Sequence, residues 1–209
     1  MGQYLEVHPV NPQPRFIREA AAVLNRGGVI AYPTDSCYAL GTLASSKSGL
    51  ERICAIRRIH PQHRFTLLLR DLSEAGTYAV FDTPTYRLLR AHTPGPYAFL
   101  LAATREAPRR LLDPKRKTIG LRVPDHPVAQ AILAEVGAPL MTSSLILPGQ
   151  DLALTDPQDI YARLEHELDL ILDSGILSSA PTTVVDLTGK EPTVVRLGKG
   201  DPAAFLPGS

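Results

Sequence analysis

The chain has 209 residues, of which 44% are hydrophobic and 21% charged, as in an ordinary globular protein. We expect residues 1–209 to form one domain. No run of about 18 apolar residues occurs, which excludes a membrane-spanning helix, and residues 1–8 lack the pattern of a secretory signal. The two cysteines, Cys37 and Cys54, are too few for a disulfide framework or a four-cysteine zinc site, and we expect a cytoplasmic protein with free thiols.

The charge is distributed unevenly, although the formal net charge is only +1. Residues 51–125 contain 14 Lys or Arg and 7 Asp or Glu, a net charge of +7, and the rest of the chain carries −6. Of the 22 basic residues, 17 are Arg, whose planar guanidinium suits contact with phosphate. A basic middle between acidic ends favours a nucleotide or a nucleic acid as ligand. An ordinary solvated surface on which basic residues cluster by chance would give the same excess of positive charge.

The hydrophobic pattern predicts helices and short strands that alternate along the chain. Helical spacing and terminal signals predict helices over residues 16–24, 47–58, 82–91 and 128–136, and a further one that starts at Asp156-Pro157. Short apolar runs predict strands over residues 29–32, 65–69, 98–103, 118–123, 140–144, 170–172, 183–187 and 193–197. This interleaving indicates an α/β fold with a mixed sheet and one core.

The most informative segment, Tyr32-Pro33-Thr34-Asp35-Ser36-Cys37-Tyr38-Ala39-Leu40-Gly41, follows the first predicted strand inside the chain. Its proline ends the strand, and Thr34, Asp35 and Ser36 then offer hydroxyls and a carboxylate at the strand's carboxyl end, where open α/β sheets bind ligands. The same side chains also suit a turn that caps itself. The segment alone leaves both interpretations open.

Other polar groups follow strands in the same way, at residues 118–122, 142–144, 182–183 and 196. Together they could line one cleft with hydroxyls and guanidiniums. Neither a phosphate-binding loop G-x-x-x-x-G-K-[ST] nor G-x-G-x-x-G after a strand occurs, and H-E-x-x-H is missing. His60 and His63 lie three residues apart, but no neighbouring ligand completes a zinc set. We therefore predict no metal site and leave the catalytic residues unassigned.

A basic cluster offers a second interpretation, in which the protein binds nucleic acid. Arg109-Arg110 and Lys115-Arg116-Lys117 lie within one short stretch, and their phosphate contacts would weaken with salt. The chain has no Trp, five Phe and seven Tyr, so stacking on single strands is less favoured than recognition of duplex RNA by shape.

Residues 32–41 resemble the Y-P-T-D-[ST]-x-Y-x-L-G signature of the YrdC family, whose members make threonylcarbamoyl-adenylate. The resemblance runs from about residue 14 to residue 200, and it is closest to the YciO branch at residues 108–112 and 115–120. Further family-like stretches occur in the same order at residues 93–96, 118–124, 142–144, 181–186 and 195–198.

The resemblance implies a YrdC-like twisted mixed sheet with flanking helices around a positively charged cavity. It implies a reaction that joins L-threonine, bicarbonate and ATP, with Mg²⁺ accompanying the ATP, into threonylcarbamoyl-AMP and pyrophosphate for the t6A modification of tRNA. Double-stranded RNA binding is also associated with the fold. The matching positions are Thr34, Arg122 and Thr182 near threonine, and Thr118, Ser143 and Arg196 near the nucleotide.

Two motifs depart from those of the synthases. Their K-x-R is Arg57-Arg58-Ile59 here, so Arg57 takes the lysine's place near the nucleotide, and their S-x-N is Ser143-Ser144-Leu145. Two lost polar contacts to the transition state would cost on the order of 10²-fold each. We expect a synthase-type nucleotidyltransferase with weak or altered activity. One alternative is a hydrolase of threonylcarbamoyl-AMP, and such an enzyme would bind AMP. The other is a double-stranded RNA- or tRNA-binding protein without synthase activity.

Overall fold

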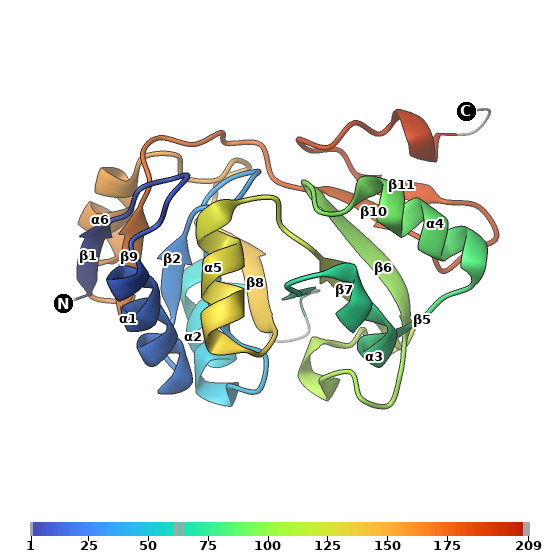
Figure 1. The fold of residues 1–209 in the computed structure, drawn as a ribbon, viewed down its shortest axis with the longest axis horizontal. Coiled ribbons are helices and arrows are strands. Elements are labelled where there is room, and N and C mark those ends of the chain that lie inside the picture. Colours follow the sequence, from blue (N-terminus) through green and yellow to red (C-terminus); the bar gives the residue numbers. More distant parts are fainter. Residues whose placement is uncertain (1, 61–62, 64, 207–209) are drawn as a thin grey trace.

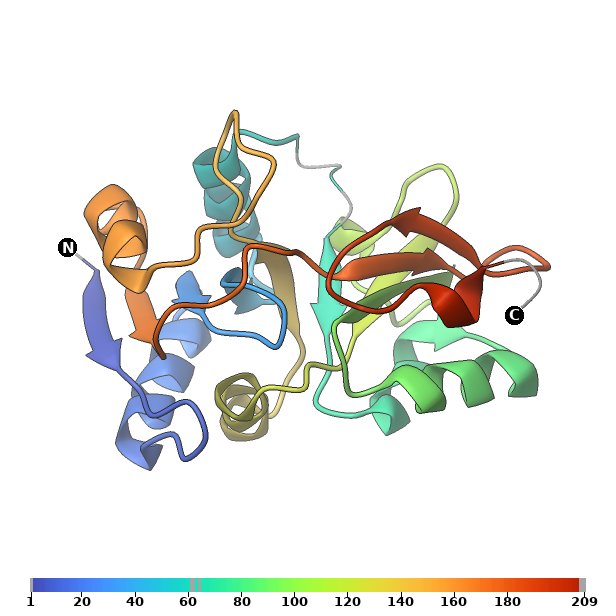
Figure 2. The same ribbon diagram turned by 90° about the horizontal axis from the view of Figure 1, so that it is seen from above.

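The computed structural model describes residues 2–60, 63 and 65–206, and the strands in this part of the chain form one large mixed sheet. Helices cover both of its faces (Figures 1 and 2). The helices are α1 (Pro14–Asn25), α2 (Lys47–Arg57), α3 (Ala75–Tyr78), α4 (Thr83–His92), α5 (Pro127–Val136) and α6 (Pro157–Leu164). The strands are β1 (Gln3–Glu6), β2 (Ile30–Tyr32), β3 (Ala39–Leu43), β4 (Thr66–Leu68), β5 (Ala79–Val80), β6 (Tyr97–Ala103), β7 (Thr118–Arg122), β8 (Leu140–Ser144), β9 (Leu170–Asp173), β10 (Thr183–Asp186) and β11 (Thr193–Arg196).

The strand order is β1-β9-β2-β3-β8-β4-β7-β6-β10-β11, and β5 pairs with β6. The sheet contains both parallel pairs, such as β4 with β7, and antiparallel pairs, such as β3 with β8. The fold class predicted from the sequence is therefore confirmed: the sheet is mixed and has flanking helices. None of the helices in the described ranges has the length and hydropathy to cross a bilayer.

Helices α4 and α6 begin directly after the aspartates at which the sequence predicted their starts. The carboxylate of Asp82 accepts from the backbone N–H of Thr85 at the start of α4, at 2.9 Å. Asp156 does the same for Gln158 at the start of α6, also at 2.9 Å. Such caps satisfy donors that have no partner within the helix, so each helix begins at a defined residue. Gly137, at φ +65°, ends α5 in the left-handed conformation that glycine tolerates.

The sequence analysis missed strands β1, β3 and β5. Strand β3 lies at the end of the segment that we interpreted as a ligand loop or a turn, and it pairs antiparallel with β2 and β8. Gly41 is required there, because a Cβ atom at this position would lie 2.7 Å from the ring of Tyr32. A Gly-containing strand with mixed polarity carries little alternation, which explains why it was overlooked.

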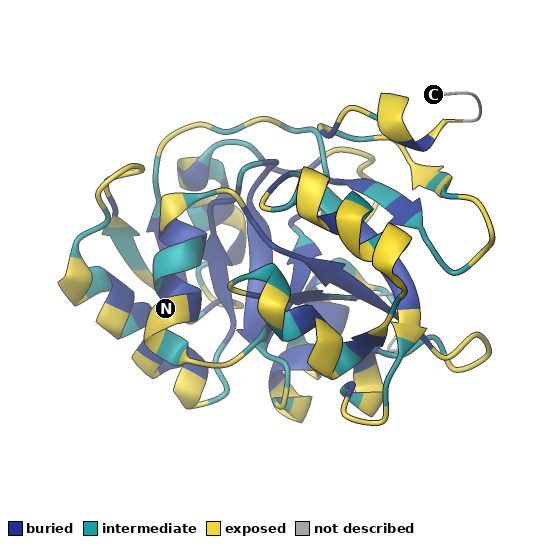
Figure 3. Cartoon of the chain, turned by 45° about the vertical axis from the view of Figure 1, so that its right-hand side comes forward, coloured by how far each residue is buried: buried dark blue, intermediate teal, exposed yellow. Residues whose placement is uncertain are grey.

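Two hydrophobic clusters fill the space between the sheet and its helices. The smaller cluster packs α1 and α5 against one face, through Leu24 and Ile132, both with no exposed surface. The larger cluster includes Ile53 of α2 and Ile160 of α6 and continues across the sheet. Figure 3 shows the strands buried beneath the more exposed helices.

Replacing Ile132 with Ala tests the packing of α5. Since the side chain is fully buried, the cavity left behind should lower the free energy of unfolding by about 2–5 kcal/mol. Urea denaturation followed by circular dichroism measures this change. Glu135→Ala, at an exposed position of the same helix, serves as the control and should change stability little. Equal stability of the two variants would contradict this account of the core.

Candidate functional site

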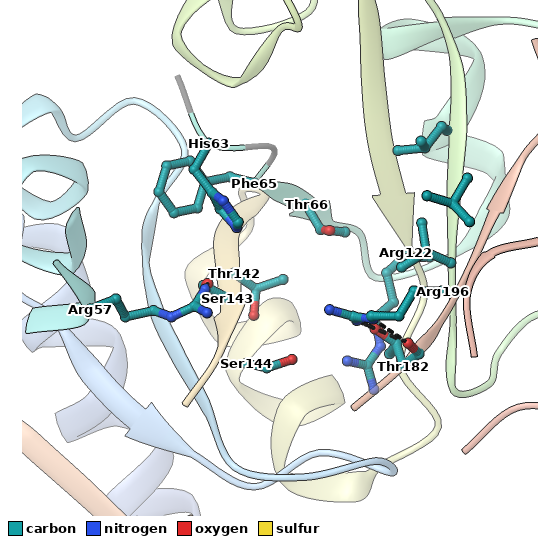
Figure 4. A pocket seen from close by; sticks show the side chains of 14 residues that line it. Arg57, His63, Phe65, Thr66, Arg122, Thr142, Ser143, Ser144, Thr182 and Arg196 are labelled. Carbon is teal, nitrogen blue, oxygen red and sulfur yellow. Dashed lines mark hydrogen bonds between the residues drawn. The ribbon is translucent and has the colours of Figure 1, made fainter. Parts of the chain in front are cut away.

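The concave side of the sheet encloses a cavity of about 270 Å³, which residues from six strands and from the end of α2 help to line (Figure 4). One part of its wall is apolar and the rest carries hydroxyls and guanidiniums. The lining residues are Arg57, His63, Phe65, Thr66, Ala98, Leu100, Arg122, Thr142, Ser143, Ser144, Thr182, Val184, Val195 and Arg196.

Strand register brings the central lining residues together. Thr142 on β8 lies opposite Thr66 on β4, and Thr66 lies opposite Gly120 on β7. Gly120 in turn lies opposite Leu100 on β6, so these residues form a row across the sheet. Arg122 is two residues beyond Gly120 and therefore points to the same face. The row and Arg122 form one wall of the cavity.

A second row reaches the edge of the sheet. Ala98 lies opposite Val184 on β10, and Val184 lies opposite Arg196 on β11. Ala98 is two residues before Leu100, so this row lies on the same face as the first. Arg122 and Arg196, which are 74 positions apart in the chain, thus line one cavity.

Arg57 connects the last turn of α2 with the end of β8. Its Nη1 donates to the hydroxyl of Ser143, and its Nε donates to the carbonyl of Ile146 at 3.1 Å. These bonds aim the guanidinium into the cavity while leaving its charge unneutralised. No acidic side chain of the described residues forms an ion pair with it.

Thr182 holds Arg196 in place on the opposite wall. Arg196 Nε and Nη2 donate to the Thr182 carbonyl at 3.1 and 2.9 Å, and Nη2 also donates to the Thr182 hydroxyl at 2.9 Å (Figure 4). Thr182 is buried, so its hydroxyl is committed to the guanidinium. The structure thus brings Thr182 to the cavity as predicted and shows that it orients Arg196.

Arg122 differs from the other two arginines because it is ion-paired. Its Nη2 contacts Asp35 Oδ1 and donates to the hydroxyl of Ser36 at 3.1 Å. The side chains of Arg122 and Asp35 are only 5% and 9% exposed. Arg122 Nε and Asp35 Oδ2 are buried and make no hydrogen bond with any described residue.

Thr34 lies behind the cavity and is not one of its lining residues. Its hydroxyl accepts from the backbone N–H groups of Ser36 and Cys37, at 3.2 and 3.3 Å, and donates to the Cys37 carbonyl at 2.6 Å. It therefore shapes the turn, one of the two roles left open by the sequence. Its link to the cavity is indirect, through Ser36, which accepts from Arg122.

The cavity is electropositive. Burial and the nearby charge of Arg196 lower the pKa of Arg57. Burial, together with the charge of Arg122, also acts to lower the pKa of Arg196. Guanidiniums remain protonated despite such shifts, because their ordinary pKa is so high. Two unneutralised positive charges therefore face one enclosed volume, which suits an anion that carries phosphate.

Thr118 is not brought to the cavity. It is the first residue of β7, whereas Arg122 is the last, so about 13 Å of extended strand separates them. Thr118 is buried and lies two residues before Gly120, beyond the row that lines the cavity. Its contact with the nucleotide stays a prediction.

The predicted nucleic-acid cluster is divided in the structure. Arg109 and Arg110 line a separate groove of about 500 Å³ that shares no lining residue with the cavity. Arg116 is ion-paired at 2.8 Å with a carboxylate of β10, which neutralises it. Lys115 and Lys117 are exposed and have no ion-pair partner within the described part of the chain.

The two apolar replacements in the synthase-like motifs face the core. Leu145 has no exposed surface and belongs to the larger hydrophobic cluster, and Ile59 packs against that cluster. Neither residue lines the cavity. These two positions therefore supply no polar side chain to the cavity.

Sequence reasoning did not foresee that Asp35 neutralises Arg122. It also missed seven lining residues, which are His63, Phe65, Thr66, Ala98, Leu100, Val184 and Val195. One signal was available, since Thr66 is a polar residue at the start of an otherwise apolar predicted strand. The ion pair joins positions 87 residues apart. No local pattern encodes such a contact.

Replacing Asp35 with Ala tests the buried ion pair. Arg122 would then be a buried charge without a partner, and we expect a loss of about 3–5 kcal/mol in the free energy of unfolding, measured by urea denaturation. The double variant Asp35→Ala, Arg122→Met removes both charges and should recover much of that loss. Equal stability of the single and double variants would contradict the account.

Comparison with known proteins connects this geometry with one family. The Sua5/YciO/YrdC family model, described as "Telomere recombination", matches residues 22–198. The uncharacterized protein YciO of Escherichia coli K12 is 51% identical over 206 residues, which cover 99% of this chain and 100% of that protein. A threonylcarbamoyl-AMP synthase of Alkalilimnicola ehrlichii is 30% identical over 183 residues, 85% of this chain and 95% of the synthase.

Solved structures show the same fold. The crystal structure of E. coli YciO matches with a TM-score of 0.95 at 51% identity, covering 99% of this chain and 100% of that one. P. abyssi Sua5 complexed with L-threonine matches with a TM-score of 0.85 at 22% identity, covering 93% of this chain and 57% of the Sua5 chain. The match of the family model to most of the sequence shows that this chain belongs to the Sua5/YciO/YrdC family.

Proposed function

We propose that this protein binds a nucleotide and catalyses chemistry of the threonylcarbamoyl-AMP synthase type. The reaction joins L-threonine, bicarbonate and ATP into threonylcarbamoyl-AMP and releases pyrophosphate, for the t6A pathway in the cytoplasm. The observation that carries the proposal is the convergence of Arg57, Arg122 and Arg196 on one cavity lined with hydroxyls. A family relative 30% identical in sequence is a threonylcarbamoyl-AMP synthase.

The arrangement suits adenylation, which depends more on alignment and charge than on covalent help from the protein. Arg57 and Arg196, both without an acidic partner in the described chain, would bind phosphate, and Ser143 would add a hydroxyl beside them. Arg122, which also lines the cavity, would take the threonine carboxylate. The fold match to Sua5 in complex with L-threonine supports this direction.

The described residues that line the cavity offer no carboxylate to Mg²⁺. None of its lining residues is acidic, and the described residues contain no cluster of three His, Cys, Asp or Glu side chains that could hold a metal. We therefore propose that Mg²⁺ enters only with the phosphates of ATP. No step of the proposed chemistry depends on a metal held by the protein.

The apolar residues Ile59 and Leu145 support a weak or altered activity rather than a full synthase. They leave fewer polar groups to stabilise charge in the transition state. Hydrolysis of threonylcarbamoyl-AMP to AMP uses the same anion-binding groups without requiring that pyrophosphate be expelled. One reaction would start from labelled ATP and another from preformed threonylcarbamoyl-AMP. The products of the two reactions would distinguish synthesis from hydrolysis.

Ser143→Ala and Arg196→Ala test the cavity directly. We expect each to reduce turnover by about 10²–10³-fold, because each removes a group that would stabilise developing charge. Pyrophosphate release from labelled ATP with threonine and bicarbonate measures the rate, and thermal shift with ATP or AMP measures binding. Arg163→Ala, at an exposed surface pair, is the control. A wild-type protein that binds no nucleotide and converts neither substrate would refute the proposal.

A second candidate function, binding of double-stranded RNA or tRNA, is favoured by the groove at Arg109 and Arg110. Arg110 is held by the carbonyl of Ser45 at 2.8 Å, and Arg109 is exposed with no acidic partner among the described residues. None of the residues that line this groove is acidic. Phosphate groups of an RNA backbone would complement its charge.

Salt titration tests RNA binding. If Arg109 contacts a phosphate, Arg109→Ala should weaken binding of a short RNA duplex and reduce the slope of log K against log salt by about one unit. Fluorescence anisotropy with a labelled duplex measures both quantities. The matched control, Arg163→Ala, should leave both unchanged. Failure of the wild-type protein to retain the duplex at low salt would rule this function out.

A further inference from the structure

We propose that His63 is the general base of the cavity, an inference that rests on the function proposed above. Among the described residues that line the cavity, His63 alone has a side chain that exchanges a proton near neutral pH. The other polar lining residues are three arginines and five with hydroxyl groups. Guanidiniums stay protonated, and hydroxyls do not hold an extra proton at this pH.

The position of His63 suits this role. Figure 4 shows its imidazole directed into the cavity, on the side where Thr142 and Ser143 lie. The ring packs edge-on against Phe65, with 5.4 Å between the ring centres and 75° between their planes. Phe65 is 2% exposed and belongs to the larger hydrophobic cluster. A side chain fixed in the core thus supports the imidazole from one side.

The proposed reaction requires a proton acceptor. The ammonium group of threonine and a bicarbonate ion form a carbamate, one water molecule and one proton. In this step the amino nitrogen gives a proton to the imidazole and uses its electron pair to form the C–N bond, and a C–O bond of bicarbonate breaks to release water. The carbamate oxygen then attacks the α-phosphate, and pyrophosphate leaves with the electron pair of the broken P–O bond.

Three of the five hydroxyls that line the cavity take part in hydrogen bonds within the protein. The Ser143 hydroxyl accepts from Arg57, and the Thr142 hydroxyl is 2.6 Å from the hydroxyl of Tyr32. That of Thr182 accepts from Arg196. His63 lines the cavity and is exposed, so a proton that it accepts can pass to solvent. The chemistry and the access of this one side chain therefore match the step.

The experiment compares His63→Gln with wild type and with His60→Gln, a control at an exposed histidine that does not line the cavity. Turnover is followed as pyrophosphate release over a range of pH, and AMP binding as a thermal shift. We expect His63→Gln to lower kcat by about 10²–10⁴-fold and to lose the rise of rate with pH that an imidazole base produces. AMP binding should stay within twofold of wild type.

Chemical rescue separates catalysis from a structural role. In His63→Ala, added imidazole should restore part of the rate in proportion to its concentration, because it supplies the missing base. If His63→Gln keeps the wild-type kcat and pH profile, the assignment of His63 is overturned, but the proposed function is not. Wild-type protein that neither binds AMP nor releases pyrophosphate would overturn the proposed function as well. Loss of AMP binding in His63→Gln, with no rescue of His63→Ala by imidazole, would show a structural role.

Discussion

Three guanidinium groups of like charge face one enclosed volume, and each is held there by a different acceptor. Arg57 donates to a hydroxyl and a carbonyl, Arg196 donates to Thr182, and Arg122 is bound to Asp35. Only the last acceptor carries a negative charge. Neutral acceptors satisfy the geometry of a guanidinium without cancelling its field, so the cavity keeps two full charges available to a ligand. The fold thus holds positive charges around one cavity, and a bound anion would reduce the repulsion between them.

The sequence predicted where the helices and strands lie along the chain better than it predicted which of them lie side by side in the fold. Proline, aspartate and glycine signals marked the helix ends, and apolar runs marked the buried strands, because both kinds of evidence are local. The cavity depends on strand order, which is not local. Thr118 and Arg122 lie on one predicted strand, yet only Arg122 reaches the cavity. Arg196 arrives through two strand pairings that no spacing in the sequence specifies.

The positions at which the sequence analysis expected departures from the synthase motifs have a structural role. Leu145 and Ile59 do not leave gaps in the cavity wall, since both pack with the hydrophobic core. Arg57 carries a positive charge, and its planar guanidinium donates to two acceptors at once. The result is a guanidinium fixed in direction rather than a mobile ammonium. A guanidinium held in this way loses little conformational freedom when a ligand binds.

The cavity and the groove place the same residue type in two different settings. In the cavity, hydrogen bonds from the surrounding wall fix the guanidiniums before any ligand arrives, which favours a small anion of defined shape. In the groove, Arg109 is exposed and not ion-paired among the described residues, so it can follow the phosphates of a larger partner. Positive charge alone therefore does not decide between nucleotide and nucleic acid. The choice between these two ligands depends on how tightly the protein orients each arginine, and the arginines of the cavity are the more tightly oriented.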